Sequence, residues 1–186
     1  NVTLENFTLQ GDETTNQHYP IHAYSSAGVN GLTISSITVK DSYRTGIDLN
    51  GVTDDAANTL QDITVTGADY GFGLAMSACQ GVTVDGITTN DNAWGDVGIY
   101  PSNQVEQPTI GIVFQGTLDL SNGEGAITIQ PNGATPADDI TYSTSDNTDA
   151  LYDAGADVTV PADFNHAVFA VRDSDDLQNH ILTQDD

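Results

Sequence analysis

Two residues with side chains suited to acid–base chemistry, His22 and Asp48, occupy matching places in two short apolar runs, residues 21–23 and 47–49. In each run the polar residue stands between two apolar ones. An imidazole beside a carboxylate can act as a general acid or base, with the carboxylate as its orienting partner. A solvated surface histidine next to an aspartate would have the same sequence, so a purely structural pair is the competing interpretation.

Aromatic and charged residues gather just before such runs. Tyr43 and Arg44 precede the run at 47–49, Tyr70 precedes the next, and Trp94 and Asp96 lie before the one after that. Pyranose rings have apolar faces that stack on aromatic side chains, so these five residues predict a glycan-binding row. Arg44 could recognise a carboxylate. The alternatives are that the rings cover the ends of the core and that Arg44 pairs with a nearby aspartate.

A phrase of the form apolar-x-x-apolar-Thr predicts how these residues are brought together. Its four copies begin at Leu4, Ile34, Leu60 and Val84, which stand 30, 26 and 24 residues apart. Such spacing is typical of stacked solenoid coils. Most copies are followed by a second run, Gly-apolar-x-apolar or a close variant, at residues 46–49, 71–74 and 96–99. Each coil is therefore predicted to contain at least two short strands.

Alignment of the second runs places one outward-facing residue of each coil in a common column. From coil to coil the column contains His22, Asp48, Gly73, Gly98 and Thr128. Because equivalent positions of stacked strands are neighbours, His22 and Asp48 are predicted to lie within hydrogen-bonding reach. The two glycines beside them predict a shallow trough in which a sugar chain could lie.

Two-residue alternation broken by Gly, Asn and Asp predicts strands and turns with almost no helix. The phrase, followed by Asn- and Asp-rich turns and Gly-Ile-x-Leu, resembles the right-handed parallel β-helix superfamily with the pectate-lyase-like fold. We therefore expect an all-β, right-handed, single-stranded parallel β-helix of about five coils over residues 1–138. Residues 139–186 are expected to form a terminal coil and an acidic, β-rich cap that covers the open strand edges.

The resemblance leaves two classes of function open, because the superfamily includes lyases, hydrolases, epimerases, tailspikes, adhesins and structural surface proteins. The first is an extracellular or cell-surface structural or adhesive module, a rigid acidic rod that contacts polysaccharide or identical subunits. The second is a polysaccharide-acting enzyme, or a fragment of one, that uses the trough around His22 and Asp48. Members that act on uronates neutralise a carboxylate with Lys, Arg or Ca²⁺, and here Arg44 is the cation near the predicted trough.

The charge balance narrows the range of partners. Three Lys and Arg residues stand against 27 Asp and Glu residues, a net charge of −24 in a chain of 186 residues. Such a surface repels nucleic acid and anionic membranes, so neither is an expected partner. Solubility in high salt and Ca²⁺ binding at carboxylate-rich turns are the two interpretations of this acidity. Ca²⁺ is thus the one cofactor considered, although no turn has the spacing of a known calcium loop.

Features that would indicate another class of protein are missing from the sequence. There is no run of about 20 apolar residues, so no membrane insertion is expected. The chain opens directly in a strand pattern with no signal peptide, which predicts a processed mature protein or a fragment that is secreted or at the cell surface. The lone cysteine, Cys79, lies among small residues and is expected to be a packed thiol.

Overall fold

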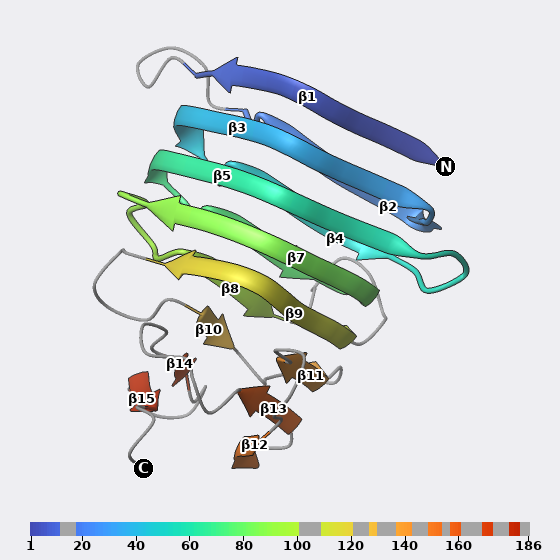
Figure 1. The fold of residues 1–186 in the computed structure, drawn as a ribbon, viewed down its shortest axis with the longest axis vertical. Coiled ribbons are helices and arrows are strands. Elements are labelled where there is room, and N and C mark those ends of the chain that lie inside the picture. Colours follow the sequence, from blue (N-terminus) through green and yellow to red (C-terminus); the bar gives the residue numbers. More distant parts are fainter. Residues whose placement is uncertain are drawn as a thin grey trace.

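The computed structural model describes residues 1–11, 18–100 and 109–120 and, beyond these, the strands within 127–129, 137–142, 149–153, 157–160, 169–172 and 179–182. These residues form strands and turns without any helix, and parallel strands stack as a β-solenoid of about four turns (Figure 1). The predicted all-β, parallel stack is therefore confirmed. The handedness of the winding stays a prediction.

The solenoid is built from two sheets, and each turn of the stack gives one strand to each. The bounds of the strands are β1 (Val2–Gln10), β2 (Ile21–Val29), β3 (Leu32–Arg44), β4 (Ile47–Val52), β5 (Asn58–Tyr70), β6 (Leu74–Ser77), β7 (Gln80–Asn90), β8 (Val97–Tyr100), β9 (Thr109–Leu120), β10 (Ile127–Ile129), β11 (Ala137–Tyr142), β12 (Asp149–Asp153), β13 (Asp157–Val160), β14 (Phe169–Arg172) and β15 (Asn179–Leu182). The first sheet has the order β1-β3-β5-β7-β9-β11-β13-β12, and the second has the order β15-β14-β10-β8-β6-β4-β2.

The repeated phrase sets the register of the first sheet. Leu4 pairs with Ile34, Ile34 with Leu60, and Leu60 with Val84, as the alignment of the copies predicts. The strand β9 continues the column, with Phe114 opposite Val84. The threonines of the phrase form a second column, consisting of Thr8, Thr38, Thr64 and Thr88. In-register β-branched pairs of this kind stabilise neighbouring strands.

Each phrase contains one residue with a positive φ, which interrupts the regular inward and outward alternation of side chains along its strand. In β3, Ile34 and Ile37 are both buried, although a regular strand would point residues three positions apart to opposite faces. Ser36 between them has φ of 52°, in the left-handed region, and this bend lets both isoleucines face the core. The equivalent residues that share the positive φ are Asn6, Asp62, Gly86 and Gly116.

One apolar core runs through the stack. Its buried members include Ile37, Ile63 and Ile87, one from each of three successive strands of the first sheet. Leu4 and Phe7 pack against this core but are only partly buried, because β1 lies at the edge of its sheet. The apolar side chains are thus fully buried in the central coils and partly exposed in the first coil.

The parallel progression ends with an antiparallel strand in each sheet. β12 pairs antiparallel with β13, and β15 pairs antiparallel with β14. These strands lie in the segment 139–186, where a terminal coil and cap are predicted. The residues between the strands of that segment are outside the described part of the chain, so the boundary at residue 138 stays a prediction.

Candidate functional site

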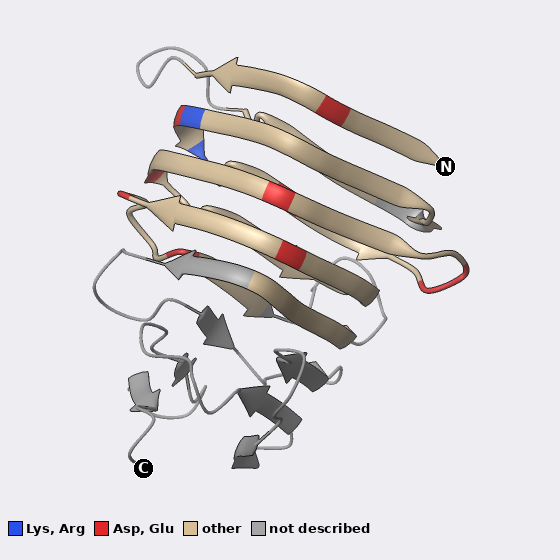
Figure 2. Ribbon diagram, viewed as in Figure 1, with Lys and Arg blue, Asp and Glu red and all other residues tan. Residues whose placement is uncertain are grey.

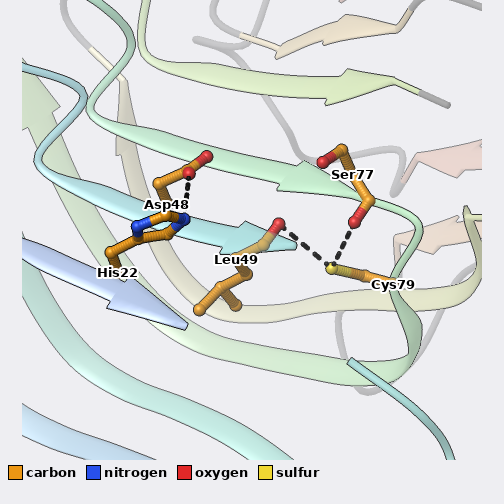
Figure 3. Close-up of polar contacts among 5 residues, drawn as sticks. All are labelled: His22, Asp48, Leu49, Ser77 and Cys79. Atoms are coloured by element: carbon orange, nitrogen blue, oxygen red, sulfur yellow. Dashed lines mark hydrogen bonds and ion pairs between the residues drawn. The ribbon is translucent and has the colours of Figure 1, made fainter. Parts of the chain in front are cut away.

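His22 and Asp48 lie opposite each other on β2 and β4, in the register that their sequence predicts. His22 Nε2 is 3.1 Å from Asp48 Oδ2, which makes an ion pair when the imidazole is protonated and the carboxyl group is ionised (Figure 3). The side chain of His22 is 39 % exposed and that of Asp48 is 9 % exposed. The pair therefore presents its imidazole to solvent and keeps its carboxylate inside.

Burial changes the acidity of Asp48. Loss of hydration raises the pKa of its carboxyl group above the ordinary value, and the positive charge of His22 opposes this effect to a smaller extent. A carboxyl group in this setting holds a proton more readily than a solvated aspartate. The 3.1 Å contact allows Asp48 to orient the imidazole of His22.

The prediction of a trough beside this pair is wrong, because the register of the third coil differs by two residues from the predicted alignment. Ala75, and not Gly73, lies opposite Asp48, and Gly98 follows on β8. Gly73 stands one strand position before β6, where its carbonyl oxygen accepts a hydrogen bond from the N–H of Ile47 at 3.0 Å. Thr128 continues the column opposite Gly98, as predicted.

The surface along this column is filled. Ala75 is 0 % exposed. A Cβ atom placed on Gly98 would lie 2.6 Å from the ring of Phe72, so that ring covers the glycine directly. Among the described residues of the second sheet, Ala75 and Gly98 therefore leave no open channel beyond Asp48 for a sugar chain.

Aromatic side chains gather instead where each coil passes from the first sheet to the second. We call this set, Tyr19, Tyr43, Tyr70, Phe72 and Trp94, the aromatic corner. The ring centroids of Tyr43 and Tyr70 are 4.7 Å apart, and those of Phe72 and Trp94 are 6.0 Å apart with an edge-to-face orientation. Tyr70 is 55 % exposed and Trp94 is 59 % exposed. The corner thus presents rings to solvent on successive coils.

Tyr19 joins the aromatic corner to the His22–Asp48 pair. Its ring centroid is 4.9 Å from that of His22, and the Cζ atom of Arg44 lies 5.6 Å from it on a cation–π contact. The ring of Tyr24 also lies near His22, at 5.8 Å between centroids. The acid–base pair and the corner are therefore one continuous surface.

A pocket of about 240 Å³ opens at this corner between the first two coils. The side-chain amide of Gln10 donates a hydrogen bond to the carboxylate of Asp41, and Ser42 Oγ donates one to the carbonyl oxygen of Arg44 at 2.6 Å. These bonds hold the wall of the pocket in place. The lining residues are Leu9, Gln10, Gly11, His18, Tyr19, Pro20, Ser42 and Tyr43.

The structure brings three of the predicted glycan-contacting residues together and leaves the other two apart from them. Tyr43, Arg44 and Tyr70 meet near the His22–Asp48 pair, with Arg44 opposite Tyr70 on adjacent strands. Trp94 lies one coil further along, against Phe72. Asp96 is 0 % exposed, so its carboxylate is inside the turn and not at the surface where a sugar would touch it.

Two aromatic residues of the corner are not among those that the sequence predicts to contact a glycan. Tyr19 and Phe72 each stand two residues before a strand of the second sheet, β2 and β6 respectively. This shared offset is the signal that would have revealed them. It becomes visible only once the starts of those strands are known.

Other reactive groups do not add to the site. Among the described residues, no three His, Cys, Asp or Glu side chains lie close enough to hold a metal ion, and Ca²⁺ binding stays a prediction. The thiol of Cys79 is buried and faces the carbonyl oxygens of Leu49 and Ser77 at 3.4 and 3.3 Å (Figure 3). Burial raises the pKa of this thiol to about 12, which makes it the packed, unreactive group that was expected.

Comparisons of the chain with protein-family models, with curated proteins and with solved structures find no match. The solenoid is therefore established by its strand register, and the likeness to the pectate-lyase-like superfamily stays a prediction. Within the described part of the chain, no helix has the length and apolar character needed to cross a membrane.

Proposed function

We propose that the chain is an extracellular or cell-surface structural module whose aromatic corner binds a polysaccharide. The observation that carries the proposal is the exposure of Tyr70 and Trp94, at 55 % and 59 %, on neighbouring coils of one corner. Burial of a large apolar side chain contributes roughly 1.5–3 kcal/mol, and this stabilisation is largely forgone at both residues. Exposed rings that line up are typical of a binding surface.

The solenoid supplies rigid support for these rings. Hydrogen-bonded strands hold successive coils roughly 4.8 Å apart, so the rings keep a fixed spacing along the stack. We include in the proposal a right-handed, pectate-lyase-like winding, which the phrase and its Asn- and Asp-rich turns favour. A stack of this kind presents a ligand with a long, preorganised surface, and preorganisation reduces the entropy lost on binding.

The charge distribution favours a neutral glycan. Lys40 and Arg44 lie together at the end of β3, while acidic residues are spread over several strands and turns of the described chain (Figure 2). With a net charge of −24, the molecule repels polyanions and other copies of itself at low salt. An acidic rod that stays dispersed and binds uncharged sugar chains agrees with this balance.

A polysaccharide-acting enzyme is the second candidate. It is favoured by Asp48, a buried carboxyl group with a raised pKa that contacts His22 beside the pocket. A glycoside hydrolase needs a second carboxylate roughly 5–9.5 Å from the first, and Asp96 is buried within its own turn. A lyase or epimerase needs cations at a developing anion, and Arg44 lies over the ring of Tyr19. Binding without catalysis is therefore the better supported function.

The test is affinity electrophoresis of the purified chain through gels that contain neutral polysaccharides or uronans, with and without Ca²⁺. We expect retardation by a neutral polysaccharide, affinity lowered about tenfold in Tyr70→Ala, and affinity retained in Tyr70→Phe, which keeps the ring. Free migration through every gel, or equal losses in the two variants, contradicts the proposal. Release of new oligosaccharide ends that His22→Ala abolishes would establish the enzyme instead.

A further inference from the structure

We infer that the pocket and the aromatic corner bind a single neutral oligosaccharide, with one sugar ring in the pocket and the following rings on Tyr70 and Trp94. This inference rests on the proposed function and adds the class of ligand, its direction and the order of its subsites. The ligand lies parallel to the stack axis and runs from the first two coils toward the fourth.

The pocket has the size and the lining of a site for one ring. Its volume of about 240 Å³ is below the roughly 300–1,000 Å³ of pockets that enclose drug-sized ligands. Tyr19 and Tyr43 supply aromatic surface, and Gln10, Gly11 and Ser42 supply polar groups at the walls. A pyranose has the matching character, because its faces are apolar and its edges carry hydroxyl groups.

The lining also indicates that the ring is neutral. None of the described residues that line the pocket is Lys or Arg. The amide of Gln10 already donates to the carboxylate of Asp41, and this carboxylate would repel an anionic sugar. Arg44 is directed at the face of Tyr19, at 5.6 Å from the ring centroid. A uronate would therefore find no basic partner among the described lining residues, and the carboxylate of Asp41 lies behind Gln10.

The pocket and the corner share a residue, which sets the path of the ligand. Tyr43 lines the pocket, and its ring centroid is 4.7 Å from that of Tyr70 on the next coil. The N–H of Trp94 donates to the carbonyl oxygen of Gly71 at 3.1 Å, so Trp94 lies directly beside the turn that follows Tyr70. The second and fourth coils are two strand spacings apart, about 10 Å. That distance suits a short oligosaccharide.

The test is a length series of neutral β-1,4-linked oligosaccharides of glucose, xylose or N-acetylglucosamine, from the monosaccharide to the hexasaccharide. Binding to the full chain is measured by NMR titration for the short members and by calorimetry for the long ones. We expect affinity to rise over the first few rings and then to level off once Trp94 is covered. Uronic acid chains of equal length are expected to bind more weakly at low salt.

Variants separate the subsites. His18→Trp and Gln10→Trp each fill the pocket, and we expect both to weaken binding of every length, the monosaccharide included, at least tenfold. Trp94→Ala is expected to weaken only the longer members, roughly tenfold, and to leave the monosaccharide unaffected. Tyr24→Ala is the matched control, because its 46 % exposed ring lies outside the pocket and the corner. Circular dichroism and urea midpoints check that each variant is folded.

The outcomes distinguish failure of the subsite inference from failure of the proposed function. If a neutral polysaccharide binds and Tyr70→Ala weakens it, but both pocket-filling variants bind normally, the subsite inference is wrong and the proposed function stands. Equal weakening by Trp94→Ala at every length contradicts the order of subsites. Tighter binding of uronate chains contradicts the ligand class. Absence of binding to all carbohydrates overturns both proposals together.

Discussion

Replacement of Ile63 by alanine tests how firmly the repeated phrase is built into the core. Ile63 is 1 % exposed and lies in register between Ile37 on β3 and Ile87 on β7. Because strands flank it on both sides, the surrounding structure has little room to collapse into the cavity that alanine leaves. Buried Ile-to-Ala changes cost 2–5 kcal/mol, and we expect about 4 kcal/mol here.

The equivalent residue of the first coil, Phe7, provides the comparison. Phe7 pairs with Ile37 on one side only, and it is partly buried at the edge of its sheet. A fully buried phenylalanine would cost about 3–5 kcal/mol on truncation, but part of this ring is already in water. We therefore expect Phe7→Ala to cost about 2 kcal/mol, less than the truncation of the smaller Ile63.

Urea denaturation followed by far-UV circular dichroism measures both values at one fixed salt concentration. Thr64→Ala, on the outer side of the strand beside Ile63, is the control and should change stability by less than about 1 kcal/mol. For a chain of this length, 4 kcal/mol corresponds to a fall in Tm of roughly 8–16 °C. A cost below about 1 kcal/mol for Ile63→Ala, or one no larger than that of Phe7→Ala, would show that the central coils are packed no more tightly than the first coil.

Three further predictions concern single groups. Asp62→Gly should stabilise the chain by up to about 1 kcal/mol and Gly86→Ala should destabilise it by about 1 kcal/mol or more in the same assay, because both residues have positive φ, 52° and 84°. Because burial raises the pKa of Asp48 in the folded state, stability should fall as pH rises from the ordinary aspartate value through the raised one. Asp48→Asn should flatten that fall in a plot of Tm against pH. Cys79, whose pKa is about 12, should react with a thiol reagent only after unfolding.

The first sheet could be predicted because its phrase is unambiguous. A phrase with two apolar residues separated by two others, and with threonine at a fixed place, can be aligned in one way only. The left-handed residues Asn6, Ser36 and Asp62 occupy the same place in the alignment, and Asn and Asp are the non-glycine residues that adopt this conformation most readily. Local pattern and long-range pairing therefore agree in this sheet.

The register predicted for the third coil of the second sheet is wrong for a physical reason. Residues 71–74 and residues 73–76 both fit the pattern Gly-apolar-x-apolar. A shift of two residues preserves which side chains point inward, so the alternation cannot distinguish the two alignments. The structure selects the later one, and Phe72 becomes a covering ring on Gly98 instead of a core residue.

The candidate site was only partly accessible from the sequence. The proximity of Tyr43, Arg44 and Tyr70 follows from the phrase, because each lies shortly after a copy of it. The pocket does not follow, since it depends on how Tyr19 packs back against the ends of β1 and β3. The burial of Asp96 was equally hidden, because a turn sequence does not distinguish an inward carboxylate from a solvated one.

Trp94 gives a direct measurement of sugar binding at the aromatic corner, because it is the only tryptophan of the chain and is 59 % exposed there. Titration of a neutral polysaccharide should shift its fluorescence emission saturably to shorter wavelength and protect it from acrylamide quenching. Tyr70→Ala should need about tenfold more ligand for the same shift. Unchanged emission and unchanged quenching with every glycan tested would contradict the claim that this corner binds sugar.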